Sequence, residues 1–536
     1  MTADDGFDTL TWLDVNEGFL RGDLSLPGAK SRSSSSRSPK SAGERYRRLP
    51  TGAHGIDPEE VKRDQRERLQ SAIVELIAER GYRAVRILDL TKLARVSRPT
   101  FYSLFDDKEE LLLAAYDEIA QRTAKTVIAA YAVRDAGDAP NGRLQAAIRA
   151  FAELAASAPE ATSLMVLGAF GAGPKAIERR NHTLEALERS IRVSRDGASS
   201  GAAVGAGGRR GKAKARVQAE TGKESGEDLT VKVILGGIRE VTAARLRQGR
   251  AEELPGLAGE LATWAACYPV KLPAGLRVAH RRPHRPGEPD ETTTPAAGSR
   301  SERALRAEGR LPSGRHDLPR QFIVKNQRER IVDATAAIVA EKGLASLTIP
   351  EIARRANVSH QTFYEMYPTK HDAFLGTQKV GLHQALGVTI AAYEENEEDW
   401  PRGVAAGVRA LLGYLASEPA HAHLILVDTF AASPEAIEIR DTSIHAFAAY
   451  LQPGYHYAAS SWSSGSGTSG GGSGTVPGVA PEAIAGGIWQ VLNYYIEDER
   501  TDELPEVAPQ LIYAALTPFI GPRDAAKAAR RAPARR

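Results

Sequence analysis

Apolar residues recur every three or four positions along most of this 536-residue chain. That spacing is the period of an amphipathic α-helix, and no stretch alternates cleanly enough to require a β-strand. The pattern therefore predicts an all-α protein. Segments rich in Ser, Gly, Pro and charge interrupt it and are expected to be disordered, because they cannot bury a core: residues 1–56, 197–228, 271–318 and 460–480.

The helical pattern occurs twice. Residues 66–108 align without a gap on residues 328–370, with 15 identities in 43 positions. Further matches follow: Gly236-Gly237-Ile238 corresponds to Gly486-Gly487-Ile488 at an offset of 250 residues. The number of residues between equivalent positions is smaller here than in the first alignment. The difference arises mainly in the two Gly-rich loops, where chain length changes at little cost. The chain is therefore a duplicated unit of about 200 residues.

Each copy begins with signals for three short helices. In the first copy Asp57 and Pro58 are typical of a helix start, and Gly81 is typical of its end. The first helix presents an apolar stripe made of Leu69, Ile73, Leu76 and Ile77. In the second copy Gly343 ends the first helix, and Thr348 with Glu351 predicts a capping box at the start of the next.

A short turn separates the second and third helices, at Arg95-Val96 and at Asn357-Val358. Ser97 and Ser359 then cap the third helix of each copy. Two helices joined by such a turn form a helix-turn-helix, whose second helix enters the major groove of DNA by its N-terminal residues. The simplest role for Phe101, Leu104, Phe363 and Met366 is to close the core of this domain.

The side chains expected to contact DNA lie at the start of the third helix or beside it. Arg98 can bind guanine and Gln361 adenine through two hydrogen bonds, while hydroxyl groups suit phosphate oxygens. Lys108 and Lys370 follow the third helix and are expected to touch a phosphate. The complete predicted set is Arg86, Ser97, Arg98, Pro99, Thr100, Tyr102 and Lys108 in the first copy, and Thr348, Ser359, His360, Gln361, Thr362, Tyr364 and Lys370 in the second.

The runs VSRPTFYSLFDDKEELL and TIPEIARRANVSHQTFYEMYPTKHDAFL resemble the N-terminal domain of TetR-family (AcrR-like) regulators over about 50 residues each. The resemblance implies units of nine helices, a ligand pocket in the C-terminal helices and dimerisation through the last two helices. The first copy departs from the family pattern at Arg86, where the family has a capping Thr, as Thr348 is in the second copy. A phosphate contact from Arg86 would therefore use a different geometry.

These signals divide the chain into seven parts. They are a basic tail (1–56), a first helix-turn-helix domain (57–121), a first C-terminal helical domain (122–270), a linker (271–318), a second helix-turn-helix domain (319–383), a second C-terminal helical domain (384–522) and a second basic tail (523–536).

The C-terminal helices are expected to form a pocket and a dimer face. Glycine pairs at 236–237 and 486–487 lie inside helical patterns, where each Gly costs roughly 1 kcal/mol against Ala. Close approach of two helices explains them, and a helix kink is the alternative. Residues expected to line a pocket for a small apolar effector are Met165, Phe170, Trp264, Leu424, Phe430, Trp489 and Tyr494. Most such residues serve only as core.

Two copies in one chain suggest an internal pseudo-dimer, with a homodimer as the alternative. A linker of about 50 residues spans roughly 40 Å, which suffices to join the two units. Because Arg98-Pro99 differs from His360-Gln361, the expected partner is double-stranded DNA with unlike half-sites. The function predicted is a ligand-responsive repressor. The alternative is a helical interaction scaffold in which one or both copies no longer bind DNA.

Composition changes this picture little. The net charge is +3, but the stretches 19–48, 271–321 and 523–536 carry net charges of +6, +5 and +5, so the folded parts are mildly acidic. Cys267 is the only cysteine, which excludes an intramolecular disulfide. No run reaches the roughly 18 apolar residues that span a membrane, and a cytoplasmic protein is expected.

No enzyme, cofactor or metal site is predicted. The run at Gly168–Lys175 lacks the Gly-Lys-Ser/Thr ending of a phosphate loop. His421 and His423 lie two residues apart, on opposite sides of a helix, and cannot share one metal ion from one face.

Overall fold

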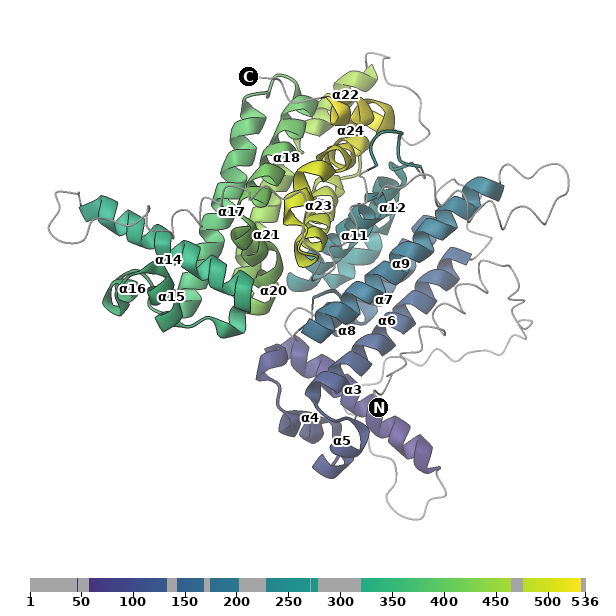
Figure 1. The fold of residues 1–536 in the computed structure, drawn as a ribbon. Coiled ribbons are helices and arrows are strands. Elements are labelled where there is room, and N and C mark those ends of the chain that lie inside the picture. The colour runs from purple at the N-terminus through teal and green to yellow at the C-terminus, as the bar shows by residue number, and fades with distance from the viewer. Residues whose placement is uncertain are drawn as a thin grey trace, which may run out of the picture. The chain divides into compact units, whose positions relative to one another are not determined.

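A computed structural model describes Tyr46 and residues 57–132, 142–167, 174–201, 228–269, 271–277, 320–463 and 476–531. Every regular element in these ranges is a helix, so the all-α prediction is confirmed (Figure 1). Most residues of the segments predicted to be disordered lie outside the described residues. The prediction is wrong at the ends of two segments, because α9 runs to Gly201, α22 runs to Ser463, and Val479 and Ala480 are buried.

The helices of the first copy follow the predicted order. They are α3 (Pro58–Arg80), η1 (Tyr82–Ala84), α4 (Ile87–Ala94), α5 (Arg98–Leu104), α6 (Lys108–Ala132), α7 (Gly142–Ser157), α8 (Pro159–Val166), α9 (Pro174–Gly201), α11 (Thr230–Arg247), η3 (Ala251–Glu253) and α12 (Leu254–Ala266).

The second copy repeats this order with two differences among the described residues: three consecutive helical segments stand at the place of α8, and a further helix, α22, follows α21. Its elements are α14 (Arg320–Lys342), η5 (Leu344–Ser346), α15 (Ile349–Ala356), α16 (His360–Met366), α17 (Lys370–Glu394), α18 (Trp400–Ser417), α19 (Pro419–His423), η6 (Leu424–Asp428), α20 (Thr429–Ala432), α21 (Pro434–Ala449), α22 (Pro453–Ser463), α23 (Ala480–Glu497), η7 (Thr501–Val507) and α24 (Ala508–Arg530). The η6 segment is a π-helix.

The described chain forms two compact units. One holds α3, α4, α5, the part of α6 up to Ala120 and most of α9. The other holds α7, α8, α11 and α12 of the first copy together with the whole second copy. The last helices of the first copy therefore pack with the second copy.

Local signals fix the start of each helix-turn-helix domain. The Asp57 side chain accepts a hydrogen bond from the Glu59 N–H, and Gly81 ends α3 at a positive φ of 74°, which an L-side chain rarely adopts. Arg95 and Asn357 take the left-handed conformation that the turn requires, at φ values of 54° and 52°. Phe101 and Phe363 are fully buried, as expected of core residues.

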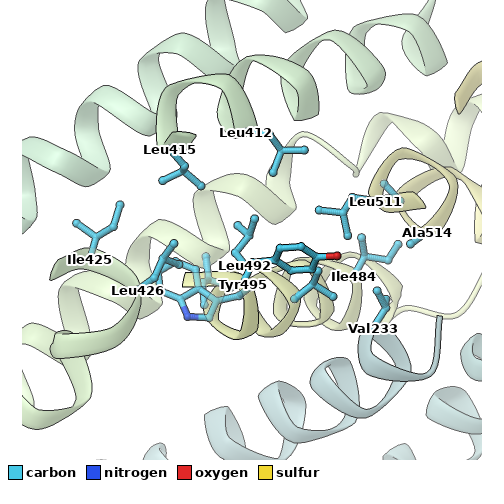
Figure 2. Close-up of a cluster of buried hydrophobic side chains, with 14 of the residues drawn as sticks. Val233, Leu412, Leu415, Ile425, Leu426, Ile484, Leu492, Tyr495, Leu511 and Ala514 are labelled. Atoms are coloured by element: carbon cyan, nitrogen blue, oxygen red, sulfur yellow. The ribbon is translucent and has the colours of Figure 1, made fainter. Parts of the chain in front are cut away.

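A single apolar core runs through the larger unit. Figure 2 shows its centre, where Leu412 and Leu415 of α18 face Leu492 and Tyr495 of α23. Val233 of α11 reaches the same cluster. The first copy therefore contributes a side chain to the core of the second.

Helices α11 and α23 cross in close contact (Figure 1). A Cβ atom placed on Gly236 would lie 2.5 Å from Gln490 Cβ, and one on Gly486 would lie 2.2 Å from Glu240 Cβ. Both helices run unbroken through their glycine pairs. The glycines are thus explained by close approach and not by a kink.

This crossing has pseudo-twofold symmetry. Residues 236 and 486 are equivalent at the offset of 250, and so are their opposite neighbours 240 and 490. The same holds one residue further on, where Gly237 meets the Ala483 carbonyl and Gly487 meets the Val233 carbonyl, each at 2.5 Å from an added Cβ. Reciprocal contacts of this kind define an isologous interface, formed here within one chain.

The structure differs from the sequence prediction at two boundaries. Helix α24 continues to Arg530, through most of the stretch interpreted as a basic tail from 523 onward, because Ala525, Ala526 and Ala529 bury one face of it. At the start of the predicted linker Leu272 and Leu276 are buried, so packing extends beyond residue 270.

Candidate DNA-binding surfaces and effector pocket

The first recognition helix, α5, is fixed by its cap. Ser97 Oγ accepts a hydrogen bond from the Thr100 N–H at 3.1 Å, and the two hydroxyl oxygens lie 2.7 Å apart. Phe101 anchors the opposite face of the helix in the core. Arg98 and Pro99 are exposed at its first turn, and Tyr102 is 49% exposed. Arg98, Pro99 and Tyr102 of α5 are thus open to solvent.

The second recognition helix, α16, has the same construction. Ser359 Oγ accepts from the Thr362 N–H at 3.0 Å, and Phe363 is buried. His360 and Gln361 are exposed, and Tyr364 is 56% exposed. The Gln361 amide donates to the Glu365 carboxylate at 3.1 Å, a bond that a base contact would have to replace.

The ammonium groups of the two lysines predicted to touch phosphate are hydrogen-bonded to backbone carbonyls of their own domains. Lys108 Nζ donates to the carbonyls of Tyr82 and Val85, both at 2.9 Å, and lies 4.0 Å from the centre of the Tyr82 ring. Lys370 Nζ donates to the equivalent carbonyl of Leu347 at 2.7 Å. Burial lowers the pKa of Lys108. Both ammonium groups therefore tie the start of the helix after the recognition helix, α6 or α17, to the chain before the second helix.

The residues before the second helix differ between the copies, as their sequences predict. Thr348 Oγ1 caps α15 by accepting from the Glu351 N–H at 3.4 Å. The reciprocal half of the predicted capping box is replaced, because the Glu351 carboxylate pairs with Lys342 at 3.0 Å and Arg354 at 2.8 Å. In the first copy the 79%-exposed Arg86 side chain points into solvent beside Asp89, at 3.4 Å.

One conserved feature of the repeat was not assigned a role from sequence. Arg68 donates to the Ala94 carbonyl at 2.6 Å, and its equivalent Arg330 donates to the Ala356 carbonyl at 2.7 Å. Both side chains are buried. Each supplies a cation to the C-terminus of the second helix, where the helix dipole favours positive charge. The sequence does carry a signal for this role, since both copies have arginine at this equivalent position.

The second copy contains a partly open apolar cavity of about 90 Å³. Helices α17, α18, α21, α23 and α24 and the π-helical η6 form its walls. The lining includes Leu382, Val404, Val408, Ile425, Leu426 and Trp489. The α17 and α18 residues went unpredicted, because apolar positions of a cavity wall and of a core follow the same helical spacing.

The residues predicted to line a pocket are scattered. Trp489 lines the cavity, whereas Leu424 is fully buried in the core outside its lining. Tyr494 places its ring 4.0 Å from Lys232 Nζ of α11, and Trp264 packs against Gly237. Met165 is half-buried on α8. Phe170 and the side chain of Phe430 lie outside the described residues.

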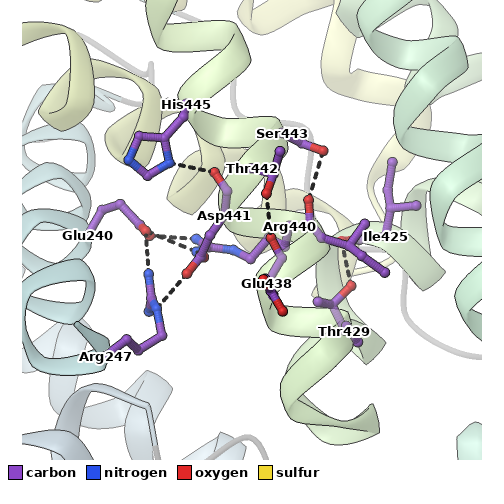
Figure 3. A network of polar contacts seen from close by, with 12 residues as sticks. Glu240, Arg247, Ile425, Thr429, Glu438, Arg440, Asp441, Thr442, Ser443 and His445 are labelled. Carbon is purple, nitrogen blue, oxygen red and sulfur yellow. Dashed lines mark hydrogen bonds and ion pairs between the residues drawn. The ribbon is translucent and has the colours of Figure 1, made fainter. Parts of the chain in front are cut away.

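A polar cluster lies where the two copies meet. Figure 3 shows Glu240 and Arg247 of α11 beside Arg440 and Asp441 of α21. The Arg440 guanidinium donates to both Glu240 oxygens, at 2.5 and 3.0 Å, and Arg247 lies 3.0 Å from Glu240 and 2.6 Å from Asp441. Burial raises the pKa of Glu240, but Arg440 and Arg247 outweigh burial and lower it to about 2.

The part of the chain that the structure describes holds no helix long and apolar enough to cross a membrane. Within the same residues, no group of three or more His, Cys, Asp or Glu side chains is placed to hold a metal ion.

Two helix-turn-helix domains, each followed by packed helices, define a tandem DNA-binding regulator. Residues 69–115 and 331–375 each match the model of the bacterial regulatory proteins, tetR family. The chain therefore carries two TetR-type DNA-binding domains in tandem.

Among solved structures, the chain is similar to a transcriptional regulator FadR from Bacillus subtilis, crystallised in complex with stearoyl-CoA. The two are 19% identical, the match covers 37% of this chain and 96% of that chain, and the TM-score is 0.29. Comparison with curated proteins finds no match.

Proposed function

We propose that this chain is a ligand-responsive repressor in which one polypeptide supplies both halves of the DNA-binding dimer. The pseudo-twofold crossing of α11 and α23 carries the proposal, because a symmetric interface inside one chain replaces the contact between two identical subunits. The two helix-turn-helix domains then act as a pair on one operator.

The two domains differ where they meet base edges, so the operator has unlike half-sites. Arg98 favours guanine and Gln361 favours adenine, and both stand exposed at the first turn of their helices. The residues that position these helices on phosphates are the hydroxyls of Thr100, Tyr102, Thr362 and Tyr364.

Selection and sequencing of DNA bound by the purified full chain tests this function. The expected product is a non-palindromic site with two half-sites about one or more helical turns apart. A perfect palindrome would contradict the unlike half-sites. Failure to enrich any sequence would favour the scaffold alternative, in which the helix-turn-helix domains no longer bind DNA.

The apolar cavity of the second copy supports a role as effector site. Its lining is almost wholly apolar, and a protein interior rarely leaves 90 Å³ unfilled. We expect a small apolar molecule to occupy it. Val408→Trp fills the cavity and should abolish the melting-temperature shift that such a molecule causes, while leaving DNA affinity without effector unchanged. A shift that survives in Val408→Trp would place the effector elsewhere.

A further inference from the structure

The two crossing helices, α11 and α23, carry opposite net charges. Helix α11 carries four basic residues and one acidic residue, Glu240, for a net charge of +3. Helix α23 carries two acidic residues, Glu482 and Glu497, and no basic residue, for a net charge of −2. Two helices related by pseudo-symmetry therefore present opposite charges to each other.

One ion pair joins the opposite charges of α11 and α23, and two further polar contacts join α11 to the second copy. Arg245 donates two hydrogen bonds to the Glu482 carboxylate, at 2.9 and 3.1 Å, and the two side chains are only 15% and 19% exposed. Arg239 donates to Gln490, and Glu240 receives Arg440 of the second copy. Partly buried ion pairs are weakly screened by salt, so they discriminate between partners.

Equivalent residues of the two copies show which contacts a pair of identical helices, two α11 or two α23, would make. The residue equivalent to Glu482 in the first copy is Lys232, so two α11 helices would set Arg245 against Lys232. The residue equivalent to Glu240 in the second copy is Gln490, so two α23 helices would leave the buried Arg440 without the Glu240 carboxylate. Like charges, and the loss of one of the two carboxylates that Arg440 contacts (Asp441 remains), both oppose pairing.

We infer that the α11–α23 junction is a self-excluding interface: each copy accepts the other copy and rejects a second example of itself. Its partner is the opposite repeat of the same chain. The family-type dimer between identical faces is thereby replaced by a single-chain unit with a fixed order of its two DNA-binding domains. This inference does not depend on DNA binding and is tested without DNA.

The test uses charge reversals in the full chain, followed by melting temperature and by mass from light scattering. Glu482→Lys gives the second copy the residue type of the first, and Arg245→Glu opposes Glu482. Each should lower the melting temperature by about 3 °C or more. The exchange variant Arg245→Glu with Glu482→Arg should recover most of that loss. Lys527→Glu, at an exposed ion pair with Asp524, is the matched control and should shift it by less than about 1 °C.

The mass of the protein in solution, from light scattering, distinguishes the remaining outcomes. The wild-type chain and both single variants should remain at 57.6 kDa. A doubled mass in either single variant means that freed faces pair with their own kind, which overturns the inference. Unchanged melting temperatures in the single variants, or no recovery in the exchange variant, also overturn it. A wild-type mass of twice 57.6 kDa would place the partner repeat in a second chain and would also overturn the inference.

Discussion

Two exposed residues at the start of each recognition helix distinguish the DNA-binding domains. Arg98-Pro99 and His360-Gln361 occupy equivalent positions behind identical Ser caps and ahead of the same Thr-Phe-Tyr run. The shared residues hold the helix, and the differing residues face solvent. Sequence preference is therefore expected to reside in these two pairs.

Removing one base contact should weaken one half-site only. Arg98→Ala and Gln361→Ala should each weaken specific DNA binding by about 1 to 3 kcal/mol, because one contact of two hydrogen bonds to a base contributes about that much binding free energy. Binding titrations on operators mutated in one half-site measure this. Equal losses on specific and random DNA would show that these side chains contact only phosphate.

Acid should weaken the junction through Glu240. Its pKa lies at about 2 in the folded chain, against an ordinary value of 4.5, so the unfolded chain binds the proton more readily. The stability that Glu240 contributes is present above about pH 4.5 and is lost as the pH falls toward 2. Melting temperatures across this range should fall less steeply in Glu240→Gln, which starts from a lower stability. Parallel curves for the two proteins would be evidence against this role of Glu240.

At the scale of elements, the glycine pairs decide how closely two helices meet. Gly487 lies against the backbone carbonyl of Val233, which cannot rotate away as a side chain does. Gly413, inside α18, has open space where a Cβ would lie. The same substitution should therefore have opposite effects at these two helical positions.

Gly487→Ala should destabilise the larger unit by about 1 to 3 kcal/mol, because overpacking forces the helices apart. Gly413→Ala should stabilise it by up to about 1 kcal/mol, since Ala is the better helix former. Denaturant unfolding of both variants provides the comparison. A neutral Gly487→Ala would mean that α11 and α23 separate without cost.

At the scale of the whole molecule, duplication within one chain gives each DNA-binding domain a fixed identity. A dimer of identical subunits carries the same recognition helix twice, whereas this chain carries two different ones, α5 and α16. The junction between α11 and α23 joins the two copies through charge and close contact. In the proposed function, the order of the two half-sites is set by the chain itself.

Exchanging the recognition residues should reverse the operator. The variant Arg98→His, Pro99→Gln, His360→Arg and Gln361→Pro moves each pair to the other domain, and proline remains in the first helical turn, where it is tolerated. Footprinting on an operator labelled at one end should show the same site bound in the opposite orientation. An unchanged orientation would assign half-site choice to residues outside these pairs.

The sequence by itself determined the elements and their repetition. Caps such as Asp57, Ser97 and Ser359 and the left-handed turn at Asn357 act within a few residues, so local pattern suffices to place them. The duplicated signature was enough to identify two helix-turn-helix domains, and the glycine pairs were enough to predict a close helix crossing. Local hydrogen bonding and helical periodicity carry all of this information.

Only the tertiary structure decided which distant residues meet. It paired Lys108 and Lys370 with backbone carbonyls about 23 to 26 residues away, and it built the pocket from helices that look like ordinary core in sequence. It also brought Arg245 to Glu482, across 237 residues of chain. Such contacts depend on how helices pack, and helical periodicity gives the buried face of a helix without naming its neighbour.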